Sequence, residues 1–162
     1  AVMNQAINLL VFDEKNRVLL QLRDQKANIL NPGVWAFPGG TSKSGESVVQ
    51  ASKREIKEET GLIIKKIKLF SSNYFSDQNA MVHFCMTKVS SQKQIHCYEG
   101  QEMRFFSILE VLPLKVAKNY KLLMIWFYLR SVFSFDISSF FLYLSQLVFL
   151  SIPTLVSARL SR

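Results

Sequence analysis

The sequence predicts an α/β fold in which helices pack on a mixed β-sheet. Apolar, β-prone runs recur through residues 1–120, and one segment between them carries the signals of a long helix. Strands that alternate with a single strong helix are typical of a sheet covered by helices. The 162 residues suffice for one domain with a core, which we assign to residues 1–120, followed by a hydrophobic extension at residues 121–162.

The first two strands are predicted to form a hairpin. Residues 5–12 and 17–22 are apolar and β-prone, and they flank the polar, turn-like residues 13–16. Residues 30–40 contain two prolines and three glycines, so we expect a loop there, with at most a short strand before Pro38.

The helix is predicted to begin after Ser47 and to end before Gly61. Ser47 and Gln50 have the spacing of a capping box, residues 48–60 contain no Gly or Pro, and Gly61 stands where a left-handed C-terminal cap is favoured.

Further strands are predicted beyond Gly61, at residues 62–75 and 81–89, the second with alternating apolar residues. Residues 104–108 form a shorter strand candidate, and residues 108–112 a turn or short helix. Residues 118–130 are the candidate for a C-terminal helix on the sheet.

The formal net charge of +8 favours polyanionic partners such as phosphates, but no basic block stands out. Cys85 and Cys97 lack zinc-site spacing and are expected to be reduced thiols of a cytoplasmic protein. Residues 1–4 show no basic segment before an apolar stretch, so no secretory signal is expected there.

Three carboxylates fall on one face of the predicted helix. Glu55, Glu58 and Glu59 stand at i, i+3 and i+4, where like charges on an exposed helix cost about 0.2–0.5 kcal/mol per pair. A hard divalent cation would give a reason for this arrangement, because it binds several anionic oxygens. The alternative is a solvated face on which these glutamates mix with lysines. Gly39 and Gly40 just upstream allow the backbone to approach a ligand closely.

The spacing of these residues resembles the Nudix box, G-x5-E-x7-R-E-U-x-E-E-x-G-U, in which U is apolar. Every fixed position matches: Gly40, Glu46, Arg54, Glu55, Ile56, Glu58, Glu59, Gly61 and Leu62. The chain is also similar to Nudix hydrolases at residues 19–24, 32–40 and 99–102, so the resemblance covers about residues 4–120. It implies a Nudix α/β/α sandwich with a mixed sheet.

The resemblance also implies roles for individual residues. The implied metal ligands for Mg²⁺ or Mn²⁺ are Glu55, Glu58, Glu59 and the Gly40 carbonyl, with Glu99 for a second metal or for water activation. Arg54 would orient a box glutamate through a salt bridge, and Glu46 would be structural or lie outside the ligand set. The general base is Glu55 or Glu99, and the sequence leaves both open. For Glu99 the alternative is an ordinary surface loop residue, with Glu102 as its substitute.

The implied activity is metal-dependent hydrolysis of a diphosphate linkage in a nucleoside diphosphate linked to another moiety. Residues 76–80 contain neither the proline nor the tyrosine that mark two subclasses of the family, and the pattern of coenzyme A hydrolases is missing. Nucleoside triphosphates and nucleotide sugars remain, and no nucleic acid partner is expected. Arg23, Trp35 and Phe37 are the candidate substrate-binding residues; the alternative for both aromatic residues is core packing. The rival function is a Nudix-fold module that senses a nucleotide without turnover.

The hydrophobic extension contains residues 137–156, which carry no charge and are long enough to span a bilayer. Three interpretations are open. The run is a membrane anchor, or an apolar helix that covers the sheet or pairs two copies of the chain in a homodimer, or a segment produced by a slipped reading frame. The expected location is cytoplasmic, with membrane attachment only under the first interpretation.

Overall fold

The computed structural model describes residues 4–29, 31–75, 79–90, 93–117 and 120–133. The chain divides into two compact units, residues 1–117 and residues 118–162. The hydrophobic run at residues 137–156 lies outside the described residues.

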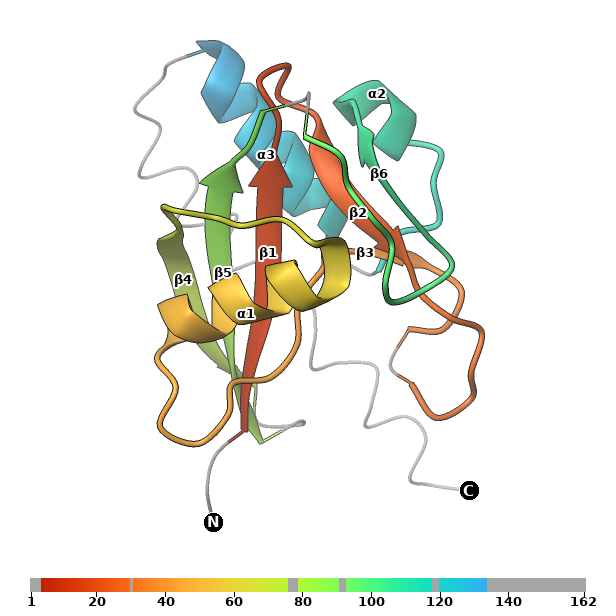
Figure 1. Ribbon diagram of the computed structural model, residues 1–162. Coiled ribbons are helices and arrows are strands. Elements are labelled where there is room, and N and C mark those ends of the chain that lie inside the picture. Colours follow the sequence, from red (N-terminus) through yellow and green to blue (C-terminus); the bar gives the residue numbers. More distant parts are fainter. Residues whose placement is uncertain (1–3, 30, 76–78, 91–92, 118–119, 134–162) are drawn as a thin grey trace. The chain divides into compact units, whose positions relative to one another are not determined.

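The first unit is built on one mixed sheet (Figure 1). Its strands are β1 (Asn4–Phe12), β2 (Val18–Leu22), β3 (Trp35–Ala36), β4 (Lys68–Phe75), β5 (Ala80–Lys88) and β6 (Glu102–Phe106). The order is β3-β2-β1-β5-β4, and β6 pairs with β2. Strands β1 and β5 pair in parallel along their whole length, while all other pairs are antiparallel. The predicted mixed sheet and the N-terminal hairpin are confirmed.

Helix α1 (Val48–Thr60) crosses one face of this sheet (Figure 1). Its ends are those that the sequence predicts. Ser47 and Gln50 form a reciprocal capping box, and Gly61 ends the helix in the left-handed region at φ 75°. Ala51 and Ile56 are fully buried against Ile7 and Leu9 of β1, so the apolar side of the helix rests on the centre of the sheet.

The strand predicted at residues 62–75 is wrong over its first part, because β4 begins only at Lys68. Leu62 and Ile64 are buried in the cluster beneath α1, and the segment that carries them has no strand partner among the described residues. Their apolar character therefore reflects packing of the connection. The strand predicted at residues 81–89 is β5, and His83 and Cys85 between its apolar residues are buried as well. Side chains are therefore buried on both faces of β5.

Two helices follow β6 in the chain. Helix α2 (Ile108–Val111) begins after Ser107, which caps it together with Glu110. In the second unit, helix α3 (Tyr120–Phe133) occupies most of the segment predicted as a C-terminal helix. Among the described residues, no helix has the length and apolar character needed to cross a membrane.

Candidate active site

The segment at residues 38–42 is fixed along β1 by a short ladder of main-chain hydrogen bonds. The Leu9 N–H donates to the Pro38 carbonyl at 2.8 Å, the Ile7 N–H to the Gly40 carbonyl at 2.7 Å, and the Ser42 N–H to a carbonyl of β1 at 2.9 Å. A Cβ atom at Gly39 would collide with the Ile7 carbonyl oxygen. The close approach therefore requires glycine at position 39.

Gly40 makes room for the carboxylate of Glu55. A Cβ atom at position 40 would lie 2.5–2.6 Å from the Glu55 carboxyl atoms, well inside van der Waals contact. The first glycine of the box thus creates the space into which α1 directs this acid. The Gly40 carbonyl, an expected metal ligand, already accepts one hydrogen bond, and its second lone pair is available.

Arg54 is hydrogen-bonded to several members of an acidic cluster, which we define as Glu46, Glu55, Glu58 and Glu59. Its Nε and Nη2 each donate to Glu46 at 2.9 Å, and Nη2 also donates to the Thr41 carbonyl at 2.9 Å. Its Nη1 donates to Glu55 at 2.7 Å and to Glu58 at 3.0 Å. All five N–H groups of the guanidinium are therefore engaged. These bonds, those to Glu46 first, raise the pKa of Arg54 and hold the pKa of Glu46 at about 2.

The three helix glutamates differ sharply in exposure. The Glu58 side chain is 52% exposed, that of Glu55 is 14% exposed, and the Glu59 residue is only 2% exposed. Glu59 accepts a hydrogen bond from the Gly39 N–H at 3.0 Å. Burial is the main cause that raises the pKa of Glu59 to about 8, and the nearby charge of Glu99 adds to it.

Glu99 reaches this cluster on a loop tied to two elements. The Tyr98 N–H donates to the Glu59 carbonyl at the end of α1 at 2.9 Å, and the Gln101 N–H donates to the Leu22 carbonyl at the end of β2 at 2.8 Å. The loop therefore bridges the helix and the sheet. This places Glu99 near Glu59, although the two lie far apart in the sequence.

The candidate substrate-binding residues fall into two groups. Arg23 follows β2, and its charge acts to lower the pKa of Glu59, so it lies near the acids. Trp35 and Phe37 are 9% and 3% exposed, and the Trp35 ring meets the Phe106 ring edge-on at 4.7 Å. This burial favours core packing over base stacking for both aromatic residues.

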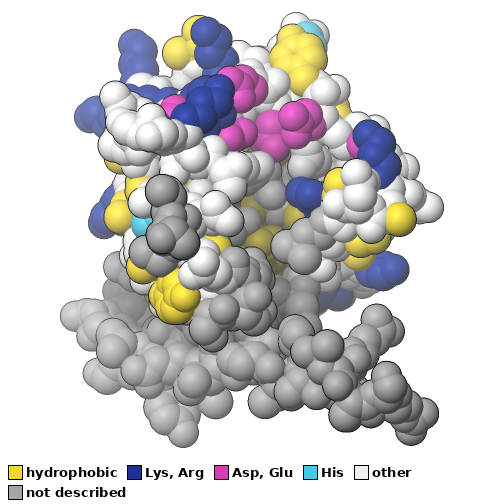
Figure 2. Space-filling view, turned by 90° about the horizontal axis from the view of Figure 1, so that it is seen from below, with side chains coloured by type: hydrophobic (Ala, Val, Ile, Leu, Met, Phe, Trp, Pro, Cys, Tyr) yellow, Lys and Arg dark blue, Asp and Glu magenta, His cyan; other side chains and the backbone are white. Residues whose placement is uncertain are grey.

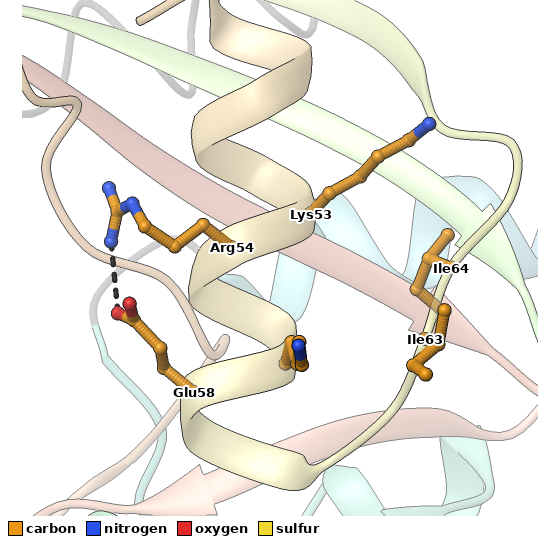
Figure 3. A pocket seen from close by; sticks show the side chains of 6 residues that line it. Lys53, Arg54, Glu58, Ile63 and Ile64 are labelled. Atoms are coloured by element: carbon orange, nitrogen blue, oxygen red, sulfur yellow. Dashed lines mark hydrogen bonds and ion pairs between the residues drawn. The ribbon is translucent and has the colours of Figure 1, made fainter.

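Figure 2 shows acidic side chains gathered along one side of the face it presents, with basic side chains next to them. A hollow of about 500 Å³ lies on the outer side of α1 (Figure 3). Its lining residues are Lys53, Arg54, Lys57, Glu58, Ile63 and Ile64. It shares Glu58 with the acidic cluster, whereas Glu55 and Glu59 do not line it.

Sequence reasoning missed residues that hold the site without carrying its charge. Thr41 supplies a carbonyl to Arg54, and the Lys43 N–H donates to Glu46 at 2.9 Å. Gln21 donates to the main-chain carbonyl of Glu99 in the loop that carries this acid. Main-chain contacts and a lone strand glutamine leave no spacing signal in a single sequence.

Comparisons with known proteins show which family this chain resembles. The family model of the NUDIX domain matches residues 3–127. An 8-oxo-dGTP diphosphatase of Buchnera aphidicola is 43% identical over 56 residues, which are 35% of this chain and 41% of the relative. An m7GpppN-mRNA hydrolase, NUDT17, of Xenopus laevis is 40% identical over 67 residues, which are 41% of this chain and 20% of the relative. The chain thus spans less than half the length of these curated relatives.

Solved structures of similar proteins have the same fold. The MutT protein from Methanosarcina mazei aligns with a TM-score of 0.65 and 21% identity, over 80% of this chain and 95% of that one. The NUDIX domain of Shewanella oneidensis NrtR, solved with ADP ribose, aligns with a TM-score of 0.67 and 17% identity, over 82% and 90%. With the box assembled around Arg54 and the family match covering most of the sequence, the chain belongs to the Nudix family.

Proposed function

We propose that this chain hydrolyses a diphosphate linkage in a nucleoside diphosphate linked to another moiety, with nucleoside triphosphates and nucleotide sugars as the candidate substrates. The observation that carries the proposal is the gathering of acids at one end of α1: Arg54 holds Glu55 and Glu58, and the buried Glu59 lies beside them within the electrostatic influence of Glu99. Relatives named as diphosphatases and pyrophosphatases support the reaction class.

The donor set fits a hard divalent cation such as Mg²⁺ or Mn²⁺. Its side chains offer carboxylate oxygens, the preferred ligands of such ions, and the missing side chain of Gly40 leaves the Glu55 carboxylate against the main chain. Among the described residues, no group of three acidic, histidine or cysteine side chains is already placed to hold a metal ion, and Arg54 holds both Glu55 and Glu58 by hydrogen bonds. We therefore assign the ligand role to Glu55, Glu58 and Glu59 with the Gly40 carbonyl, and expect Glu55 and Glu58 to turn from Arg54. The bound ion would neutralise phosphate charge and lower the pKa of a water molecule.

The chain's own residues supply orientation and proton transfer. Arg54, anchored on Glu46 by two hydrogen bonds, fixes the side chains of the cluster. Arg23, whose charge acts on Glu59, is assigned the role of contributing positive charge to a phosphate group of the substrate. A carboxylate of Glu55 or Glu99 takes the proton from the attacking water. The two bases are distinguishable by the pH dependence of single variants.

The experiment is a panel of nucleotides incubated with the protein and either Mg²⁺ or Mn²⁺. We expect release of a nucleoside monophosphate and its loss in Glu58→Gln, while Glu14→Gln at the β1–β2 turn serves as the matched control. No turnover of any member with either ion would contradict the proposal. Binding of a nucleotide without turnover would instead support the rival function, a nucleotide-sensing module.

A further inference from the structure

Gln21 is a buried amide in a strand of otherwise apolar residues. It lies on β2, between Leu20 and Leu22, and is only 3% exposed. A buried side-chain amide without a partner costs about 1–3 kcal/mol, so such a group is retained where it is hydrogen-bonded. Its Nε2 donates to the main-chain carbonyl of Glu99 at 2.8 Å.

The contact is made at the point where the Glu99 loop passes over β2. A Cβ atom at Gly100 would lie 3.0 Å from Cγ of Gln21 and 2.6 Å from the Leu22 carbonyl oxygen, so loop and strand are in close contact. Gly100 adopts φ 80°, which favours glycine and turns the chain between Glu99 and Gln101. The Cys97 thiol also donates to the Glu99 carbonyl, at 3.0 Å.

The main-chain hydrogen bonds of this loop fix neighbours of Glu99, whereas Gln21 and the exposed Cys97 thiol donate to Glu99 itself. The Tyr98 N–H is held by α1, and the Gln101 N–H is held by the end of β2. Gln21 is the buried side chain that holds the main chain of Glu99 itself. The Glu99 side chain is exposed, and the position of the main chain that carries it decides which groups its carboxylate can reach.

We propose that Gln21 is a positioning residue, which fixes the main chain of Glu99 so that its carboxylate faces the glutamates of α1. The proposal rests on the proposed function in one respect, that Glu99 takes part in the reaction. Partners that orient a functional carboxylate typically change activity or metal affinity about 10–100-fold when they are removed.

The first test is Gln21→Met, which keeps the volume and removes the N–H donor. We expect kcat to fall about 10–100-fold with KM nearly unchanged. Thr87→Val is the matched control, because Thr87 is also buried in the sheet and also donates to a main-chain carbonyl, that of Lys66 at 2.7 Å, but away from the acids. Wild-type kcat in a folded Gln21→Met protein would overturn the proposal. If that variant does not fold, Gln21→Asn, whose amide is too short to reach, replaces it.

A double-mutant cycle with Glu99→Gln separates positioning from a general loss of packing. If Gln21 acts through Glu99, the substitution at position 21 costs no further activity once Glu99 is neutral. If the two losses multiply instead, Gln21 acts elsewhere and the proposal falls.

Two readouts do not require turnover. We expect faster amide exchange at Tyr98 and Gln101 in Gln21→Met, and weaker Mn²⁺ binding by electron paramagnetic resonance, with neither change in Thr87→Val. These changes in a protein that hydrolyses nothing would support the placement of Gln21 and contradict the proposed function. Unchanged exchange and unchanged Mn²⁺ affinity would overturn the placement itself.

Discussion

Gly40→Ala is expected to lower the catalytic rate and to leave the free energy of unfolding nearly unchanged. The new methyl group would lie 2.5 Å from Cδ and Oε1 of Glu55, whereas non-bonded carbon atoms are at their best separation at about 3.5–4.0 Å. The Glu55 carboxylate must therefore move by roughly 1 Å. A misplacement of about 1 Å in a catalytic arrangement costs on the order of 100-fold in rate, which corresponds to about 2.7 kcal/mol in the activation barrier.

The free energy of unfolding is expected to change by less than about 1 kcal/mol in the same variant. Gly40 does not adopt a positive φ, and the group that must give way is the end of a flexible side chain. The assay is kcat on a nucleotide substrate, measured beside urea unfolding. Gly45→Ala is the matched control: it has φ 78° and no atom within 4 Å of the added Cβ, so it should lose stability and keep kcat. A Gly40→Ala protein with wild-type kcat would refute the placement of Glu55.

Three further outcomes are expected. Burial lowers the pKa of His83, so as pH falls the unfolded chain binds a proton before the folded chain does. The free energy of unfolding should therefore fall as pH drops below the usual histidine pKa of 6.5. The midpoint of urea unfolding should change less between pH 7.5 and pH 5 in His83→Gln than in the wild-type protein. Ser47→Ala should reduce the free energy of unfolding by about 1 kcal/mol through loss of the N-cap, with Ser44→Ala as the control in urea titrations. If residues 137–156 are a membrane anchor, the full chain should sediment with lipid vesicles and a chain ending at Phe133 should stay in the supernatant; equal behaviour of the two would remove the anchor interpretation.

Local signals predicted the helix of the site well. The hydroxyl of Ser47, the amide of Gln50 and the flexibility of Gly61 act within a few residues of themselves, so their effect is visible in the sequence. The start of β4 was not predictable in this way, because a buried connection and a buried strand have the same composition.

The differences among the acids depend on tertiary structure. Spacing places Glu58 and Glu59 next to each other on the helix, but only the packing of α1 on the sheet buries Glu59 and leaves Glu58 in solvent. The resemblance implied a salt bridge from Arg54 to a box glutamate without saying which, and Arg54 pairs with three of them, Glu46, Glu55 and Glu58. The contact of Gln21 with the Glu99 loop joins residues that are remote in sequence, so no local sequence pattern predicts it.

The ladder between β1 and residues 38–42 also bears on the order of assembly. Ile7 meets Gly40 across about 33 positions of chain, whereas its parallel partner on β5, His83, is more than twice as far away. Closing the longer loop costs more chain entropy, by about 0.6 kcal/mol for each doubling of length. Short-range closure therefore favours a folding route in which residues 38–42 pair with β1 before β1 pairs with β5. On this route, the space beside Gly40 that receives Glu55 forms before the sheet is complete.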